Sequence, residues 1–481
     1  MRGTRVAVVG GGPGGLMAAR LLEQKTGGAC RVSLFEASHR LGGKIQTRRF
    51  STASATYEAG VAECYDYEAI GRDPLKELVR ELGLRPLPTC SSTVALDGVL
   101  IRDDRELAAH IGEPALAAIE RFRRKAGAMM PMAHWYRGFG EDDNRHPWAR
   151  QTAEDILDEV DDPVARRYLT ITAHSDLATE PHLTNGLVGL RNFLKNAPGY
   201  DAQYRIDGGM EMLPRQLAAQ LTATDVQLGA PVVGVSRQGD GRYAVAVERG
   251  QHVATDDFDA VVVALPYGQL RSIEWGGERL RRAIARHVAH YDRPAHYLRV
   301  SILFAEPFWR RMVAGSWMML DAFGGCCVYD ERSGGDAAHG VLGWLFAGAD
   351  ALALCDADDE TLVARAIESL PTALQVEARG RVVEARVHRW AGALSGAPGG
   401  FPLRPVQEAH QPEPFEHGRL VVVGDYLFDS TLNGVLRSAG IATDLVLSAQ
   451  AAMHSTAQSR QAAPPAFALP VERRHLLTPI D

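Results

Sequence analysis

Glycines near the start of the chain have the spacing of a phosphate-binding turn. The pattern G-x-G-x-x-G lies between an apolar run at residues 5–9 and a helical pattern at 16–22. In this context the first glycine permits a sharp turn, the second admits a pyrophosphate to the backbone, and the third lets the helix pack on the strand. The helix N-terminus adds free N–H groups and a positive dipole. The predicted dinucleotide-binding turn comprises Gly10, Gly12, Pro13, Gly14 and Gly15.

An acidic residue ends the second predicted strand. Glu36 follows the turn by roughly 20 residues, where a carboxylate binds the ribose hydroxyls of a dinucleotide. Its charge would repel a 2′-phosphate, which argues against NADP at this site. The turn and Glu36 do not by themselves distinguish FAD from NAD.

A second glycine segment follows directly and carries two cations. The sequence E-A-S-H-R-L-G-G-K occupies residues 36–44. A flavin dinucleotide is long, and its pyrophosphate needs donors from a second segment of the chain. We therefore predict FAD, with a second binding segment that comprises Glu36, Ala37, Arg40, Gly42, Gly43 and Lys44.

The cysteines and histidines show no pattern for a metal ion. The six cysteines include no C-x-x-C pair, and the histidines do not cluster at ligand spacing. We expect reduced thiols and no metal. His174, Asp176 and His182, in the helical middle of the chain, could line a pocket, but we assign them solvated or helix-capping roles.

The elements that position these residues come from separate parts of the chain. Strand patterns at 5–9 and 31–37 flank a helix, and strand patterns return between 204 and 264 and at 420–423. Between these segments the pattern changes: helical patterns dominate from about 86 to 198, and helices alternate with strands after about 280. We predict an α/β protein in which an α+β substrate domain with a helical subdomain is inserted into a Rossmann-like FAD-binding domain. The predicted FAD-binding domain comprises residues 1–85, 200–270 and 405–455. The predicted substrate-binding domain comprises residues 86–199 and 271–404, and residues 456–481 form a C-terminal extension.

Composition excludes several classes of partner. The 481 residues carry a net charge of −7, which disfavours nucleic acid. No apolar run reaches the roughly 18 residues that a membrane span needs. A strand begins within a few residues of Met1, so we expect no signal peptide and a cytoplasmic protein without a membrane partner. A homodimer is compatible with the sequence.

Five motifs, in order, resemble those of the flavin amine oxidase family, which includes monoamine, polyamine and L-amino acid oxidases. The first is the family pattern E-x-x-x-R-x-G-G-[RK] at residues 36–44. The resemblance extends from residue 5 to about residue 451. The other motifs are acidic-x-G at 58–60, G-G-M-x-x-L at 208–213, E-P-F-W at 306–309, and G-D at 424–425 with N-G at 433–434.

The resemblance implies a place for each part of FAD. Gly60 and Val61 would pass the isoalloxazine, and Val232 or Val233 would meet the adenine end. The N–H of Val435 would approach the pyrimidine edge of the flavin, where a helix dipole favours negative charge on the reduced ring. The residues implied around FAD, beyond the opening turn, are Arg40, Lys44, Gly60, Val61, Val232, Val233, Gly424, Asp425, Asn433, Gly434 and Val435.

Asp425 would bind ribityl or pyrophosphate oxygens of FAD.

One loop indicates whether FAD is covalently attached. Some family members bond FAD covalently through a Cys in the Gly-rich loop after a Trp. Here that loop, residues 390–402, has no Cys, so the resemblance implies non-covalent FAD.

Two charged positions depart from the family pattern. Many members carry a Lys, which holds a water near flavin N5, where this chain has Arg299. Arg does not donate a proton near neutral pH, but it could stabilise negative charge, or it could be a surface residue. L-amino acid oxidases clamp the substrate carboxylate with an Arg where this chain has Glu63. If Glu63 faces the site, it would repel an α-carboxylate and attract a cation.

The aromatic walls of the monoamine oxidases also differ. Their two Tyr positions hold Gly399 or Gly400 and Val435 in this chain. Trp390 is our candidate for a rebuilt wall, although a core position would also suit it. Further candidates of the same kind are Trp344, Tyr329 and Phe304.

The sequence therefore predicts an FAD-dependent oxidoreductase that oxidises a carbon–nitrogen bond by hydride transfer to flavin and gives an imine. The chain lacks a second G-x-G-x-x-G in a strand–helix context, which favours O2 over a pyridine nucleotide as acceptor. Glu63 favours an amine or polyamine substrate over an α-amino acid. The alternatives are an L-amino acid oxidase, a carbon–carbon desaturase or protoporphyrinogen-oxidase-like enzyme, and a flavin-binding protein with impaired catalysis.

Overall fold

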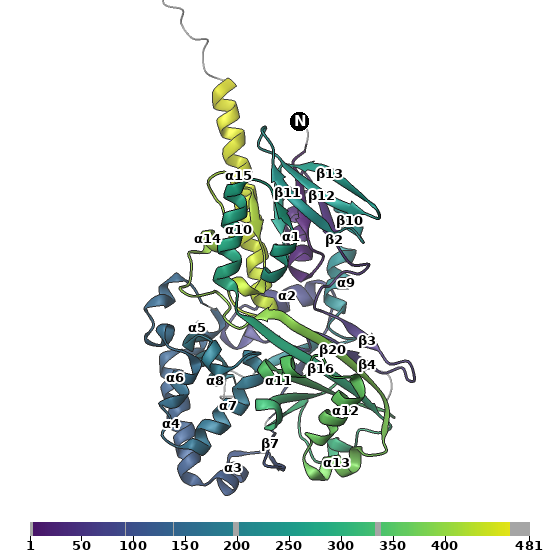
Figure 1. The fold of residues 1–481 in the computed structure, drawn as a ribbon, viewed down its shortest axis with the longest axis vertical. Helices are drawn as coiled ribbons and strands as arrows, with labels where there is room; N and C mark the ends of the chain where they lie inside the picture. Colours follow the sequence, from purple (N-terminus) through teal and green to yellow (C-terminus); the bar gives the residue numbers. More distant parts are fainter. Residues whose placement is uncertain (1–2, 92, 138, 196–201, 332–337, 462–481) are drawn as a thin grey trace, which may run out of the picture.

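The structure is a computed structural model that describes residues 3–91, 93–137, 139–195, 202–331 and 338–461. Figure 1 shows an upper part with a parallel sheet and a long helix that projects beyond it. A lower part has a second sheet on one side and a group of helices on the other.

A five-stranded parallel sheet forms the centre of the upper part, in the order β10-β2-β1-β14-β21. Its central strands are mostly apolar and buried because helices and other strands cover both faces. The strands come from three distant parts of the chain. They are β1 (Arg5–Val9), β2 (Arg31–Glu36), β10 (Asp225–Leu228), β14 (Ala260–Val263) and β21 (Leu420–Val422).

Different layers cover the two faces of this sheet. Helices α1 (Pro13–Thr26) and α15 (Leu432–Gln461) pack against each other over one face. Apolar residues of a small second sheet and of one helix cover the other face. These elements are β11 (Val232–Arg237), β12 (Tyr243–Arg249), β13 (His252–Phe258), β15 (Glu274–Trp275) and α10 (Glu278–Tyr291).

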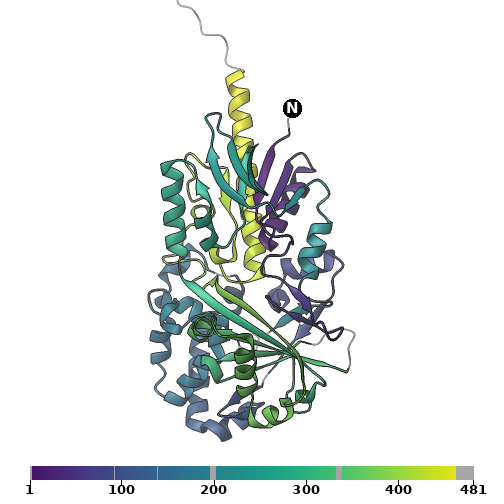
Figure 2. The same cartoon turned by 45° about the vertical axis from the view of Figure 1, so that its right-hand side comes forward.

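The lower part is built on a mixed seven-stranded sheet in the order β20-β16-β19-β18-β17-β7-β8. Figure 2 shows its two longest strands, β16 (Pro294–Phe304) and β20 (Val382–Ser395), running up to the level of the upper part. The other strands are β7 (Val94–Leu96), β8 (Val99–Ile101), β17 (Trp317–Leu320), β18 (Cys326–Asp330) and β19 (Gly340–Ala347).

Helices cover both faces of the lower sheet. One face packs on α11 (Gly348–Ala353), α12 (Asp359–Glu368) and α13 (Thr372–Ala378). The other face packs on a helical group whose core includes Met319 and Leu345 of the sheet. That group comprises α3 (Asp104–Ile111), α4 (Glu113–Met129), α5 (Met132–Arg137), α6 (Ala153–Asp158), α7 (Pro163–Leu177) and α8 (Gly186–Leu194). The predicted fold class, a Rossmann-like domain with an inserted α+β domain and a helical subdomain, is confirmed.

Short elements connect the two parts. Hairpin β3-β4 and the three-stranded sheet β5-β9-β6 are formed by the segments of the chain that link the upper sheet to the lower sheet. The connecting elements are β3 (Thr47–Arg49), β4 (Thr56–Glu58), β5 (Cys64–Tyr65), β6 (Pro86–Thr89), β9 (Gln203–Ile206), α2 (Pro74–Glu81), α9 (Met212–Ala219) and α14 (Val406–His410).

The last helix is longer than the sequence suggested. We expected a loose extension from residue 456, but α15 continues to Gln461. The reason is local: Ala, Gln and Ser continue without a Gly or Pro until Pro464, and Ala and Gln favour a helix. The rest of the predicted extension, 462–481, lies outside the described residues. Within the described chain, each helix is too short or too polar to span a bilayer.

Candidate active site

The opening turn has the geometry expected of a nucleotide-binding glycine motif. Gly10 has φ +105°, and a Cβ there would lie 2.5 Å from the carbonyl oxygen of Ala264. A Cβ on Gly15 would lie 1.9 Å from the carbonyl oxygen of Gly10. Larger residues at both positions would therefore force β1, β14 and α1 apart.

Gly12 and Gly43 form an open cradle in front of α1. Gly12 is the N-cap of α1, Pro13 is its first residue, and within the described chain no side chain caps this end. Among the described residues, the Cα of Gly43, at 3.9 Å, is the one atom within 4 Å of a Cβ built on Gly12, chain neighbours apart. The first-turn amides of α1 lack intrahelical acceptors and would face this space. These residues fit the pyrophosphate of FAD.

Glu36 is held in place beside the turn. Its carboxylate accepts hydrogen bonds from the amide of Gly11 at 2.7 Å and from the amide of Ser38 at 2.9 Å. The amide of Ala230 donates to the Glu36 carbonyl oxygen at 2.9 Å, which brings the start of β11, with Val232, close to the end of β2. This arrangement is compatible with a ribose at Glu36 and an adenine near Val232 or Val233. Ala37 is exposed at the same edge.

The two predicted phosphate cations, Arg40 and Lys44, contact protein groups. The Arg40 guanidinium donates to the carbonyl oxygens of Leu41, at 3.1 Å, and Gly43, so it shapes the second glycine loop. Lys44 Nζ donates to Asp425 Oδ2 at 2.9 Å. The predicted residues Lys44 and Asp425 therefore meet across the site, although residues 44 and 425 are far apart in the chain.

The N-terminus of α15 is built around a buried carboxylate that sequence analysis missed. Asp429 Oδ1 accepts a hydrogen bond from the amide of Thr431 at 3.1 Å, and Arg191 Nη1 lies 3.1 Å from Asp429 Oδ2. A Cβ on Gly434 would lie 2.3 Å from Asp429 Oδ1, which explains why a glycine stands there. Asn433 donates to Asp73 at 3.3 Å.

The expectation for Val435 needs a correction. Its side chain lines the cavity in front of this helix, but its N–H donates to the carbonyl oxygen of Thr431 at 3.1 Å. The amide that we expected to approach the flavin is thus engaged within the first helical turn. Of the amides before it, that of Gly434 donates to Thr431 Oγ1 at 3.1 Å. The amides of Leu432 and Asn433 lack intrahelical acceptors, as first-turn amides do.

A large cavity joins these elements to the lower part of the molecule. It brings together nine of the predicted residues, from five distant segments, and adds residues of α7, α8 and the lower sheet. The nine are Pro13, Lys44, Gly60, Val61, Glu63, Arg299, Trp390, Asp425 and Val435. Of the opening turn, Pro13 reaches this lining, and the helical group contributes Asp176 and Arg191.

Aromatic side chains form part of the cavity wall. Trp390 Nε1 donates to the carbonyl oxygen of Ala59 at 2.6 Å, which ties β20 to the loop after β4. Tyr329, one of the further candidates for a rebuilt aromatic wall, also lines the cavity. Trp344 and Phe304 are instead buried in the core of the lower sheet. The other aromatic residues of the lining, which sequence analysis did not single out, are Tyr65, Trp135, Phe139 and Tyr297.

Arg299 is buried, so the surface alternative is wrong. Its side chain is 2% exposed and forms an ion pair with the 6% exposed Glu331. Arg299 Nη1 donates to the carbonyl oxygen of Gly60 at 3.3 Å, and its Nε has no hydrogen-bond partner among the described residues. A positive charge with a spare buried donor therefore stands beside the segment where the isoalloxazine is expected.

Glu63 faces the cavity and shares a cation with a second carboxylate. Lys195 Nζ lies 3.6 Å from Glu63 Oε1 and contacts Asp176 Oδ1 directly. Burial raises the pKa of Glu63. Burial opposes the charge of Lys195, but the charges of Asp176 and Glu63 keep the pKa of Lys195 well above its ordinary value.

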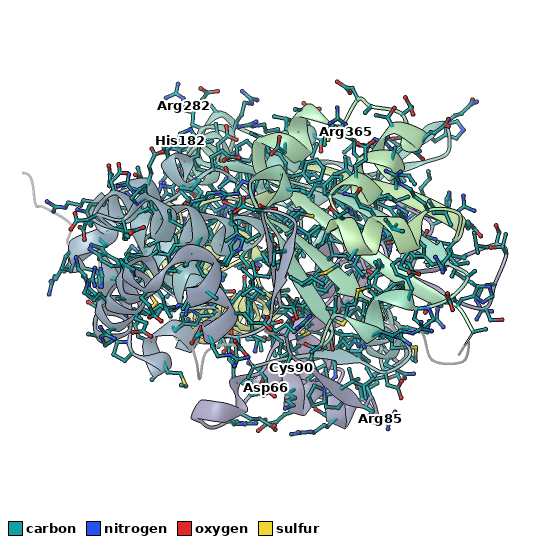
Figure 3. All side chains as sticks on the ribbon, turned by 90° about the horizontal axis from the view of Figure 1, so that it is seen from below. Asp66, Arg85, Cys90, His182, Arg282 and Arg365 are labelled. Carbon is teal, nitrogen blue, oxygen red and sulfur yellow. The ribbon has the colours of Figure 1, made fainter. Side chains whose placement is uncertain are left out.

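The assignment of solvated or capping roles was wrong for two of the three polar residues of the helical segment. Asp176 lines the cavity, and His174 is 2% exposed, with Nε2 3.1 Å from Glu180 Oε1. His182 is exposed, and Figure 3 shows it at the edge of the molecule. Helical periodicity did not reveal Asp176 because the cavity, rather than solvent, meets that face of α7.

Glu58, in the acidic-x-G motif, lies behind the cavity wall. Its carboxylate accepts hydrogen bonds from the amide of Met210 and from Thr47 Oγ1, both at 2.9 Å. Burial, together with the nearby charge of Glu331, raises the pKa of Glu58 to about 8, against the hydrogen bond from Met210. The motif thus supplies a carboxyl group that can be neutral near physiological pH.

The chain is similar to known flavin-dependent oxidases along most of its length. Residues 13–447 match a family model described as flavin containing amine oxidoreductase. The chain is 27% identical to putrescine oxidase from Kocuria rosea over 365 residues, which are 71% of this chain and 72% of that protein. It is 24% identical to a flavin-dependent L-tryptophan oxidase from Lentzea aerocolonigenes over 331 residues, 64% of this chain and 67% of that protein. It is also 27% identical to protoporphyrinogen oxidase from Bos taurus over 307 residues, 56% of this chain and 61% of that protein.

Solved structures share the fold. A putrescine oxidase bound to putrescine has a TM-score of 0.68 at 20% identity and covers 92% of this chain and 99% of its own. Cyclohexylamine oxidase from Brevibacterium oxydans has a TM-score of 0.68 at 16% identity and covers 93% of this chain and 99% of its own. At these identities the likeness concerns the fold alone.

Proposed function

Because this chain belongs to the family of flavin-containing amine oxidoreductases, we propose that it oxidises the carbon–nitrogen bond of a small primary amine. Bound FAD supplies the acceptor for a hydride from the carbon beside nitrogen, and the resulting imine hydrolyses to a carbonyl compound. The loop at 390–402 holds no Cys, which supports non-covalent FAD.

The observation that carries this proposal is the charge of the cavity. Glu63 and Asp176 line it with one cation, Lys195, between them. The other charged pairs at its wall that the structure describes are each balanced: Lys44 with Asp425, Arg299 with Glu331, and Arg191 with Asp429. One carboxylate therefore remains for a cationic substrate.

Glu63 is suited to prepare an amine for oxidation. An ammonium has no lone pair, so the substrate must lose a proton before the carbon–hydrogen bond can break. Since burial raises the pKa of Glu63, its carboxylate can attract the ammonium and then accept a proton from nitrogen. The aromatic wall of Trp390, Tyr329 and Tyr297 would exclude water and hold the neutral amine.

Arg299 and the opening turn would serve the cofactor. The Arg299 charge, fixed at the Gly60 carbonyl, would stabilise negative charge beside the isoalloxazine. Gly12, Gly43 and the start of α1 would hold the pyrophosphate. O2 is the proposed electron acceptor, with hydrogen peroxide as its product, because the chain lacks a second dinucleotide motif.

Two alternative substrates follow from the named relatives. An L-amino acid, as for the L-tryptophan oxidase, would bring its α-carboxylate toward Glu63 and Asp176, which disfavours it. A desaturase of the protoporphyrinogen oxidase kind would require an apolar pocket. Ion pairs in the cavity wall argue against such a pocket.

The test is anaerobic mixing of the purified yellow protein with separate panels of primary amines, polyamines and L-amino acids, followed by flavin absorbance. We expect amines to bleach the flavin and L-amino acids to leave it oxidised. After air is admitted, a peroxidase-coupled assay should detect hydrogen peroxide. Bleaching by L-amino acids alone would overturn the proposal. A yellow protein that none of the panels bleaches would instead point to the impaired flavoprotein or to a desaturase.

A further inference from the structure

Lys195 has the surroundings that a protein provides for a bound ammonium ion. Its side chain is 8% exposed and lies at the end of α8, in the cavity wall. The ammonium contacts Asp176 of α7, lies 3.6 Å from Glu63 Oε1, and stands 5.2 Å from the centroid of the Tyr65 ring. Two carboxylates and an aromatic face are what an alkylammonium ligand requires.

The fold itself does not require this cation. Helices α7 and α8 already pack through a continuous apolar core that contains Leu169, Leu187 and Leu190. A buried ion pair is weak support for stability, because the desolvation of both charges offsets their attraction. The position of Lys195 at the substrate cavity therefore calls for a functional explanation.

The chain offers a matched comparison in Lys76. Its side chain is also 8% exposed, pairs with Asp66 at 2.5 Å and Glu68 at 2.6 Å, and stands 5.5 Å from the centroid of the Tyr204 ring. Lys76 is absent from the described residues that line the cavity. The two lysines share their chemistry and differ in whether a substrate can meet them.

We propose that Lys195 is a specificity-determining residue: it occupies, as an internal ammonium, the place that a second ammonium of the substrate would take, so the enzyme selects monoamines against diamines. This inference rests on the proposed function of the same cavity. A monoamine brings one positive charge, which the carboxylates can balance beside Lys195. A diamine brings a second charge into like-charge repulsion with a buried lysine.

The first experiment compares butylamine with 1,4-diaminobutane by kcat/KM. The wild-type enzyme should prefer the monoamine by about tenfold or more, since one unfavourable charge contact in a buried site readily has that effect. In Lys195→Met, which keeps most of the length of the side chain and removes its charge, the ratio of diamine to monoamine kcat/KM should rise about tenfold. Lys76→Met should leave the ratio unchanged. Equal use of both amines by the wild type, or an unchanged ratio in Lys195→Met, would overturn the proposal.

A second experiment does not depend on activity. Lys195→Ala leaves both the charge and the volume of the lysine head unfilled, so ethylammonium chloride should raise its melting temperature in a saturable way. Tetramethylammonium chloride, which has no N–H donors, should not, and the rise with ethylammonium should be larger in Lys195→Ala than in the wild type, whose cavity has one carboxylate left for an amine. Absence of this difference would overturn the internal-ammonium assignment. If amines fail to bleach the wild-type flavin while ethylammonium still rescues Lys195→Ala, the substrate assignment fails and the ammonium site stands.

Discussion

The guanidinium of Arg299 donates to the carbonyl oxygen of Gly60 at 3.3 Å, so a strand of the lower sheet is bonded to the loop that follows β4. The same guanidinium is paired with Glu331. The loop at Gly60 is also bonded to the second glycine segment, since the amide of Val61 donates to the carbonyl oxygen of Lys44 at 3.2 Å. One buried cation thus fixes the lower sheet relative to the loop at Gly60 and, through it, the second glycine segment.

Replacing Arg299 by Met should destabilise the protein strongly. The change leaves the carboxyl group of Glu331 buried without its cation, which typically costs about 3–5 kcal/mol. The uncompensated Glu331 would have a raised pKa in the folded protein. Stability would then fall as pH rises from the unfolded pKa toward that folded pKa, so the loss should be greater at pH 8 than at pH 5.

Urea unfolding of the variant at both pH values checks this prediction. The double variant Arg299→Met with Glu331→Met is the control, because it removes both charges and should recover most of the loss. Equal stability of the single variant and the wild type at pH 8 would show that the pair contributes nothing.

Gly12→Ala should impair FAD binding without unfolding the protein. Gly12 has φ −73° and ψ 179°, which an alanine adopts without strain, and a Cβ there meets just the Cα of Gly43 at 3.9 Å. The methyl group would occupy the space proposed for the pyrophosphate, so FAD affinity should fall at least tenfold, about 1.4 kcal/mol.

Titration of the deflavinated variant with FAD, by fluorescence quenching, measures this loss. Gly127→Ala, in α4 with open space around its Cβ, should bind FAD like the wild type. Unchanged affinity in Gly12→Ala would place the pyrophosphate elsewhere.

Glu58→Gln should make the protein more stable at alkaline pH. The pKa of Glu58 is raised to about 8, mainly by burial, whereas an unfolded chain leaves it near 4.5. Its stabilising contribution is complete below pH 4.5 and is lost as pH rises to about 8, by about 1.4 kcal/mol for each pH unit between the two values. Gln keeps the shape and cannot ionise, so the variant should gain most at pH 8 and above.

Melting temperatures from pH 5 to pH 9 test this sign. Glu413→Gln is the contrasting control. Burial alone would raise the pKa of Glu413, but hydrogen bonds from the amides of Glu416 and His417, together with Arg279, lower it. That carboxylate stabilises the fold above its unfolded pKa, so its removal should cost stability at pH 8. A Glu58→Gln variant that is less stable than the wild type at pH 8 would contradict the neutral form of Glu58.

Glu63→Gln should weaken amine binding and change the pH profile of kcat/KM. The amide can neither attract an ammonium nor accept its proton, so the variant must bind amine that is already neutral. The acid limb of the profile should therefore move up toward the pKa of the free amine. We expect kcat/KM at pH 7 to fall about 100-fold or more, the usual effect of losing a positioned base.

Steady-state rates with one amine from pH 6 to pH 10 measure both effects. Asp176 still pairs with Lys195 in this variant, so its melting temperature should change little. A profile that keeps its wild-type shape would remove Glu63 from proton transfer.

The sequence alone determined the cofactor end of this protein. The turn at Gly10, Gly12 and Gly15 and the carboxylate at Glu36 lie within one βαβ unit, where fixed spacing in the chain becomes fixed spacing in space. The apolar runs of β1, β14 and β21 likewise predicted a buried parallel sheet. Strands that are covered on both faces do not alternate between apolar and polar residues. Such features are local, so their pattern is visible without the fold.

Only the tertiary structure decided the arrangement of the cavity that we propose for the substrate. The burial of Arg299 against Glu331, and the meeting of Glu63, Asp176 and Lys195, depend on how α7, α8 and the lower sheet pack around one cavity. Charged residues on helices normally face solvent, so helical spacing gave Asp176 an exposed role and did not single out Lys195. The partners of a buried charge come from distant segments, and their pairing is set by packing rather than by spacing along the chain.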